Sequence, residues 1–220
     1  MATAGPMATP TDAALLTLAQ WFSPGFPVGA FSYSHGQDWL VSTGALHSAA
    51  GVQTWIARVL TEGSGRNDLI LLAQAWKGGD LSELDGLARA LVPAAERLTE
   101  TGEQGEAFVR TVNAVWGLDL PPLAYPVAVG AAARALDLPL EPTARMYLHA
   151  FAAALTSAAV RAIPLGQTEG QAIVHALSPL VDRLCRDDLH APLDALGGAV
   201  FAADIAAMNH ETQYSRMFRS

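Results

Sequence analysis

Histidine, cysteine and serine are the residue types of this chain best suited to bind a metal or to act as a nucleophile. No two of the six histidines stand three or four residues apart, the spacing that places two imidazoles on one helix face. The single cysteine, Cys185, rules out an internal disulfide, and its apolar helical context is typical of a core thiol. A metal site assembled from distant helices remains open as a minor alternative.

The other patterns that carry catalytic chemistry are also missing from the sequence. Ser32, Ser34 and His35 lie close together, but no G-x-S-x-G motif surrounds them. No G-x-x-x-x-G-K-[ST] motif is present to cradle a nucleotide, and the only lysine is Lys77. The residues therefore predict no catalytic site, no cofactor and no tightly held metal ion.

Composition narrows the class of protein further. The chain has 220 residues, of which 51% are hydrophobic and 15% charged, with a formal charge of -8. The high hydrophobic fraction excludes intrinsic disorder. The negative net charge disfavours binding to nucleic acid or to an anionic membrane. The longest run without a charged side chain, residues 13–37, is broken by Pro24 and Pro27, and no lysine or arginine precedes Arg58. We expect a cytoplasmic protein whose surplus apolar surface forms a core and an interface.

Any functional residues must be positioned by helices, because apolar residues recur at helical spacing almost throughout. The clearest example is the stripe formed by Val52, Trp55, Ile56, Val59 and Leu60. No stretch alternates for long enough to indicate a strand, so the chain is expected to be all-α, with about ten helices in a single globular domain. Glycine and proline place these helices near residues 11–22, 35–41, 48–62, 69–76, 80–91, 93–116, 126–136, 142–163, 168–185 and 196–208.

The chain divides into three parts on this interpretation. Residues 1–10 are small, uninformative and expected to be disordered, and residues 11–208 form the helical domain. Residues 209–220, called the tail below, are polar, aromatic and basic. The abundance of alanine indicates that the helices pack at close range.

Three segments combine residue types in a way that folding alone does not require: residues 26–36, 161–171 and 210–220. They are either packing elements or binding surfaces, and for the first two the alternatives are evenly balanced. The tail has tyrosine, phenylalanine and arginine, which dominate binding hot spots, so there a partner is favoured. We expect a flexible tail whose loss costs the core little, although a tail folded onto its own domain is the alternative.

These segments together resemble the UreF family of urease accessory proteins. The family pattern is matched by PVGAFSYSHG at 27–36, YPVAVG at 125–130, RAIPLGQTEGQ at 161–171 and HETQYSRMFRS at 210–220. The matches come in family order and span nearly the whole chain. Residues 37–39 depart from the pattern, since members more often have Leu-Glu there.

The resemblance implies an all-α homodimer with no reaction of its own. Such a protein bridges UreD (UreH in some organisms) and the GTPase UreG in the complex that delivers nickel to apo-urease, and it influences GTP hydrolysis. The implied partner-binding residues are Tyr214, Arg216, Phe218 and Arg219 in the tail, Tyr33 and His35 in the first segment, and Trp39 just after it.

Two other classes of function stay open at this point. One is an all-α enzyme whose site is built from scattered residues, and a deep pocket of converging acids and histidines would favour it. The other is a structural helical module with no link to nickel.

Overall fold

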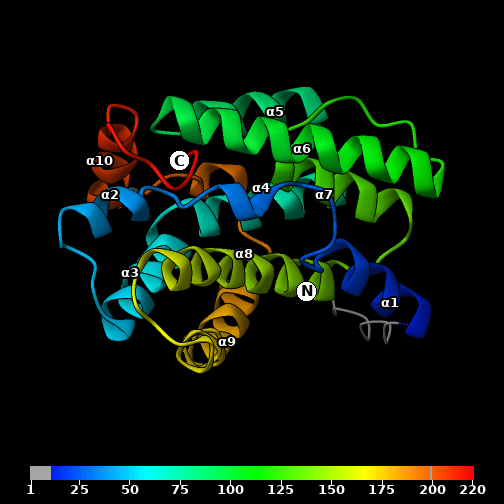
Figure 1. The fold of residues 1–220 in the computed structure, drawn as a ribbon. Helices are drawn as coiled ribbons and strands as arrows, with labels where there is room; N and C mark the ends of the chain where they lie inside the picture. The colour runs from blue at the N-terminus through cyan, green and yellow to red at the C-terminus, as the bar shows by residue number, and fades with distance from the viewer. Residues whose placement is uncertain (1–10, 199) are drawn as a thin grey trace.

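Helices are the regular elements of the computed structural model, which describes residues 11–198 and 200–220 (Figure 1). Within those residues the all-α expectation and the number of about ten helices are confirmed, in a single domain. The expected disorder of residues 1–10 lies outside the described residues. The elements are α1 (Asp12–Trp21), η1 (Ala30–Ser32), α2 (Gln37–Ser42), α3 (Ala49–Glu62), α4 (Ser64–Lys77), α5 (Leu81–Ala90), α6 (Ala95–Trp116), α7 (Tyr125–Ala135), α8 (Leu140–Ala162), α9 (Gln167–Asp188), η2 (Leu193–Ala195) and α10 (Phe201–His210).

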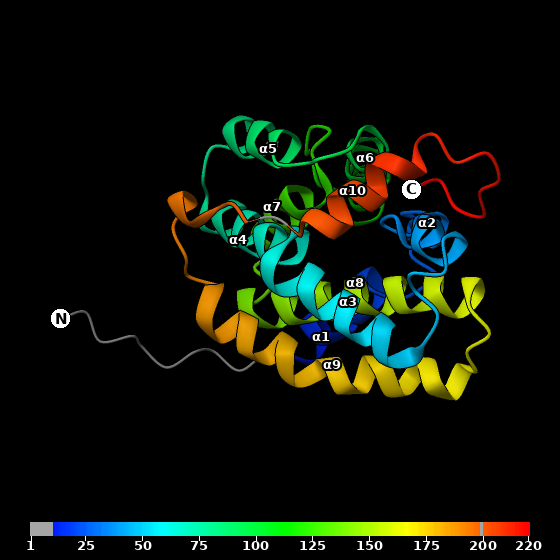
Figure 2. The same cartoon turned by 90° about the vertical axis from the view of Figure 1, so that its left-hand side faces the viewer.

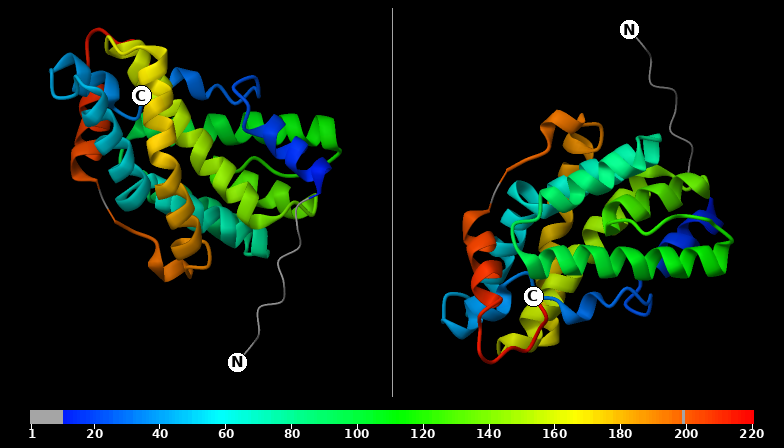
Figure 3. Two further views of the ribbon diagram at one scale, coloured as in Figure 1. Left: turned by 90° about the horizontal axis from the view of Figure 1, so that it is seen from below. Right: turned by 90° about the horizontal axis from the view of Figure 1, so that it is seen from above.

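The core forms around α4 and α7, which pack against each other more extensively than any other pair of described elements. Nearly every residue of α7 is buried, and α6 packs along it. On another side, α9 covers α3 and α8 (Figure 2, Figure 3). None of the described helices is long and apolar enough to cross a lipid bilayer.

Small residues let α4 and α7 approach closely, as the alanine content indicated. The tightest point is Gly130 on α7, where an added Cβ atom would lie 2.2 Å from the carbonyl oxygen of Leu72. No real Cβ atom tolerates so short a contact with backbone, so the two helices could not keep this separation with a larger residue at 130.

We expect Gly130→Ala to lower the free energy of unfolding by about 1–3 kcal/mol, because the core must shift to admit one methyl group. The matched control is Gly86→Ala, since Gly86 lies within α5 and has no atom within 4 Å of an added Cβ. There alanine should stabilise the helix by up to about 1 kcal/mol. Urea unfolding of both variants checks the prediction, and shifts of the same sign would contradict it.

Two helices begin earlier than the sequence indicated. The prediction for α4 placed caps at 67 and 68, but the helix already starts at Ser64, directly after the turn at Gly63. Asn67 lies inside it, and its Oδ1 atom accepts a hydrogen bond from the backbone N–H of Gly197. The start of α8 is Leu140 rather than Pro142, which sits in the first turn, where a missing N–H costs nothing.

The starts of α9 and α10 also differ from the prediction. A capping pair of Thr168 and Gln171 was expected for α9, but the carboxylate of Glu169 accepts the backbone N–H of Gly166 at 2.9 Å instead. The tenth helix was expected to start at residue 196, but the 3-10 turn η2 ends just before that position and α10 begins only at Phe201 and ends at His210.

Candidate partner-binding surface

The tail turns back after α10 and packs against the segment that follows α1 (Figure 1, Figure 2). The backbone N–H of Arg219 donates to the carbonyl oxygen of Ser32 at 2.8 Å, and that of Ser34 donates to the oxygen of Ser220 at 2.7 Å. Two of the three segments singled out in the sequence are therefore joined backbone to backbone. The expectation of a flexible tail is corrected: its polar backbone groups find fixed partners on the domain.

Asp38 fixes the turn of the tail. One of its carboxylate oxygens accepts the backbone N–H groups of Met217 and Phe218, at 2.6 and 3.1 Å. Buried backbone donors need an acceptor, and Asp38 is itself buried. The residue thus positions the tail from α2, at the place where the sequence departs from the family pattern.

Phe218 brings the third sequence segment to the same place. Its side chain is only 6% exposed, and the guanidinium carbon of Arg161 lies 4.6 Å from the centre of its ring. Arginine over an aromatic face is a favourable contact. Residues 26–36, 161–171 and 210–220 therefore meet at one surface of the molecule.

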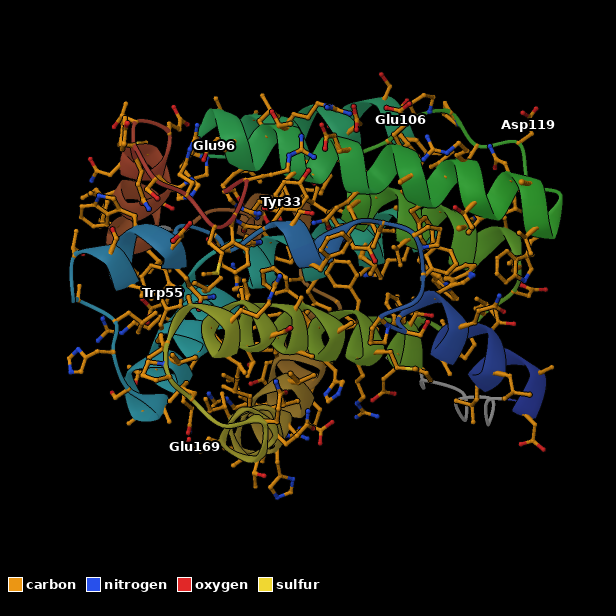
Figure 4. All side chains as sticks on the ribbon, in the orientation of Figure 1. Tyr33, Trp55, Glu96, Glu106, Asp119 and Glu169 are labelled. Carbon is orange, nitrogen blue, oxygen red and sulfur yellow. The ribbon has the colours of Figure 1, made fainter. Side chains whose placement is uncertain are left out.

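Glutamates on α6 form the other wall of this surface. Glu96, Glu100 and Glu103 stand at i, i+4 and i+7, which places them on one helix face. Glu96 lies at the start of α6 beside the tail (Figure 4). Its two carboxylate oxygens lie 2.5 Å from Nη1 of Arg216 and 2.6 Å from Nδ1 of His210.

Glu103 binds the far end of the tail. Arg219 donates two parallel hydrogen bonds to it, at 2.7 and 2.9 Å, and the hydroxyl of Tyr33 donates a third at 2.6 Å. The bonds from Arg219 and Tyr33 lower the pKa of Glu103, and burial together with Glu103 raises the pKa of Tyr33. The arginine pair is exposed to solvent, so it orients Arg219 more than it stabilises the fold.

Glu100 is the buried centre of the network. It accepts hydrogen bonds from Gln104 at 2.9 Å and from the hydroxyl of Ser220 at 2.9 Å, and it pairs with Arg97 and with His35 at 3.0 Å. Burial alone would raise the pKa of Glu100, but the charge of Arg97 and the contact with His35 lower it to about 2. The carboxylate is therefore ionised and holds four groups from three parts of the chain.

His35 occupies an unusual backbone conformation. Its φ of 54° lies in the left-handed region, which a residue other than glycine adopts only when its surroundings enforce it. The ring is buried, packs against Phe151 at 4.9 Å between centres, and has its pKa lowered by burial and then by Arg97. His35 thus acts as an interior positioning residue for Glu100.

The seven residues predicted to bind partners fall into three groups by exposure. Three have side chains in solvent, another three lie in the interior, where they support the surface, and one is partly buried. Burial follows from their hydrogen bonds and apolar contacts, which spacing along the chain could not reveal. The exposed group is Tyr214, Arg216 and Arg219; the interior group is Tyr33, His35 and Phe218; Trp39 is partly buried against the core.

Sequence reasoning missed the acidic half of this surface. The spacing of the α6 glutamates was visible, and it could have been matched with the arginines of the tail. The buried position of Ser220 left no signal in the sequence. The missed residues are Asp38, Glu96, Glu100, Glu103 and Ser220.

A cavity of about 380 Å³ lies beside this surface and brings His35, Asp68 and Glu100 together. Converging acids and a histidine are the feature that would favour the enzyme alternative. No group of three or more His, Cys, Asp and Glu in the described part of the chain is arranged to hold a metal ion. Burial raises the pKa of the Cys185 thiol to about 12, which leaves it unreactive.

Comparison with known proteins assigns the class. The model of the UreF family matches residues 46–178, which is more than half of the chain. This chain belongs to the UreF family. Similar proteins named urease accessory protein UreF include one from Cereibacter sphaeroides (strain ATCC 17025 / ATH 2.4.3), 56% identical over 207 residues, which are 94% of this chain and 99% of that protein.

More distant relatives cover the ends of the chain as well. The UreF of Ruegeria pomeroyi is 50% identical over 217 residues, 97% of this chain and 100% of that protein. The UreF of Rhodopseudomonas palustris (strain HaA2) is 44% identical over an alignment of 234 positions that covers all of this chain and 99% of the relative. UreF proteins are non-catalytic accessory proteins, so this UreF-family chain is not an enzyme and the enzyme alternative is excluded.

Proposed function

We propose that this chain is an adaptor in urease maturation, which bridges UreD (UreH) and the GTPase UreG during nickel insertion into apo-urease. It works in the cytoplasm as a homodimer and influences GTP hydrolysis by UreG. It holds no nickel or other cofactor tightly, since paired ligands and a P-loop are missing from its sequence. The family assignment supports the maturation role, and the docked tail supports the bridging role.

The observation that carries the bridging proposal is the set of side chains that the tail presents to solvent. Tyr214 is fully exposed, and Met217, Arg216 and Arg219 are also exposed. Tyrosine and arginine are enriched in binding hot spots. Because Glu96 and the α6 face hold the tail in one conformation, a partner would bind this surface with little ordering cost.

Urease activation in cells tests the proposed function. Cells that carry the urease genes but lack this one should make normal amounts of inactive urease, and the cloned chain should restore both activity and bound nickel. The Tyr214→Ala variant should restore less, because it removes the most exposed aromatic side chain of the tail. Full urease activity without the chain would contradict the proposal.

The homodimer is expected to use the outer face of α10. Phe201, Ile205 and Met208 stand at i, i+4 and i+7 and are 76%, 53% and 48% exposed, which leaves an apolar stripe in solvent. Light scattering should give about 46 kDa, twice the chain mass of 23.1 kDa. Ile205→Asp should shift the measured mass to that of the monomer. Val115→Asp, at an exposed position on α6, should leave the dimer mass unchanged. A wild-type monomer at tens of micromolar protein would contradict the prediction.

A further inference from the structure

The cavity beside the partner-binding surface is large enough for a ligand. It lies under residues 22–31 and is bounded by α6, α7 and α8, with a volume of about 380 Å³. That volume would hold roughly a dozen waters, and it falls in the range of small-molecule sites. Neither the packing of the core nor the proposed adaptor role accounts for it.

Aromatic rings line part of its wall. Tyr147 stands edge-on to Phe22 with 6.2 Å between ring centres and lies 5.4 Å from Tyr125. Phe26 and Phe151 add two further rings. The faces of such rings carry negative electrostatic potential and attract cations.

A carboxylate from α4 completes the site. Asp68 accepts a hydrogen bond from the hydroxyl of Tyr147 at 2.8 Å, but it makes no salt bridge with any described residue. Arg97, the one arginine or lysine of the cavity wall, is paired with Glu100. Burial raises the pKa of Asp68 to about 7, as expected for a carboxylate without a counter-charge in contact.

We propose that this cavity binds a small organic monocation, an alkylammonium or quaternary ammonium, with its charge beside Asp68 and its carbon atoms against the rings. A neutral ligand would leave the carboxylate desolvated and unpaired. A divalent metal would need several ligands, whereas Glu100 is already occupied by four groups. The proposal is independent of the adaptor role.

Calorimetric titration of the full chain with choline tests the site, with 3,3-dimethylbutan-1-ol as its neutral isostere. Choline should bind at least about tenfold more tightly than the alcohol at pH 8, because only choline pairs with the carboxylate. At pH 6 choline affinity should fall several-fold, since Asp68 is then largely protonated. The other charged or titratable groups that face Asp68 are His35, Arg97, Glu100, Tyr125 and Tyr147.

Two variants test separately the charge of Asp68 and the free volume of the cavity. Asp68→Asn keeps a hydrogen-bonding side chain but removes the charge, and it should weaken choline binding at least about tenfold. Asp119→Asn, on an exposed loop before α7, is the matched control and should bind as wild type (Figure 4). Ala154→Leu fills the cavity from α8 and should block binding even if Asp68→Asn fails to fold.

Three results would overturn the proposal: no binding of choline over a millimolar series, equal binding of choline and the alcohol, or unchanged choline binding by Asp68→Asn. Urease activation by the wild-type chain without added choline would leave the adaptor role intact in each case. Failure of this site and failure of the proposed function are therefore distinguishable.

Discussion

Replacing Glu100 with alanine is expected to lower the free energy of unfolding by about 3–5 kcal/mol, the usual cost of removing one partner from a buried ion pair. The substitution leaves Arg97 without its carboxylate in the interior and removes the acceptor of the Ser220 hydroxyl. Undocking of the tail should accompany the loss, because Ser220 would lose a buried hydrogen bond. Chemical unfolding and proteolysis of the tail are the two measurements.

The control for this prediction lies on the same helix. Glu106 is exposed on α6, and Glu106→Ala should change the free energy of unfolding by less than about 0.5 kcal/mol (Figure 4). Equal effects at positions 100 and 106 would show that the buried network does not stabilise the fold.

Lowering the pH should gradually remove the stabilisation that the ionised Glu100 carboxylate provides. The pKa of Glu100 is about 2 in the folded protein against an ordinary value of 4.5, so its contribution is complete above about pH 4.5 and is lost as the pH falls toward 2. The difference corresponds to about 3 kcal/mol. In Glu100→Gln the free energy of unfolding should depend less on pH over this range. A variant that keeps the wild-type pH dependence would contradict the assignment of the lowered pKa to Glu100.

Deleting residues 209–220 is expected to abolish capture of the UreD-type partner and also to lower the thermal stability of the domain. The sequence alone indicated that deletion would cost the core little, but Phe218 and Ser220 are buried, so that expectation is corrected. The helices should persist by circular dichroism, since the deletion removes only the last two residues of α10 and no other helical residue. Pull-down of the partner is the measurement.

Point variants separate partner contacts from tail docking. Tyr214→Ala should weaken capture by about 2 kcal/mol, roughly thirtyfold, without changing stability, because its side chain contacts only solvent. Arg216→Ala should weaken capture too, whereas Ser215→Ala, also exposed, is the control. Ser220→Ala should instead lower stability by about 1–3 kcal/mol, because it removes a buried hydrogen bond. Full capture by the truncated chain would exclude the tail as the binding element.

The fold was predictable because apolar spacing and Gly/Pro breaks are local signals. The stripe from Val52 to Leu60 does form one buried face of α3. The predicted start of α4 was wrong for a tertiary reason. Asn67 looked like a cap, but its side chain bonds a loop 130 residues away.

The candidate surface was predictable only in part. Unusual composition identified its three segments, yet nothing in the spacing showed that they touch each other. Phe218 looked like a partner anchor because aromatic residues serve both interfaces and cores, and only the fold decides between them. The α6 glutamates were visible as a stripe, but their partners in the tail lie more than a hundred residues away.

The hydrogen bond between Ser34 and Ser220 joins residues 186 positions apart. Contacts between such distant residues carry a high loop-closure entropy and tend to form late in folding. The exposed side chains of the tail are thus correctly arranged only after α6, α8 and the first segment are in place. Under the proposed function, a partner that recognises this surface binds only chains that have folded completely. Partly folded copies would therefore be left out of the assembly.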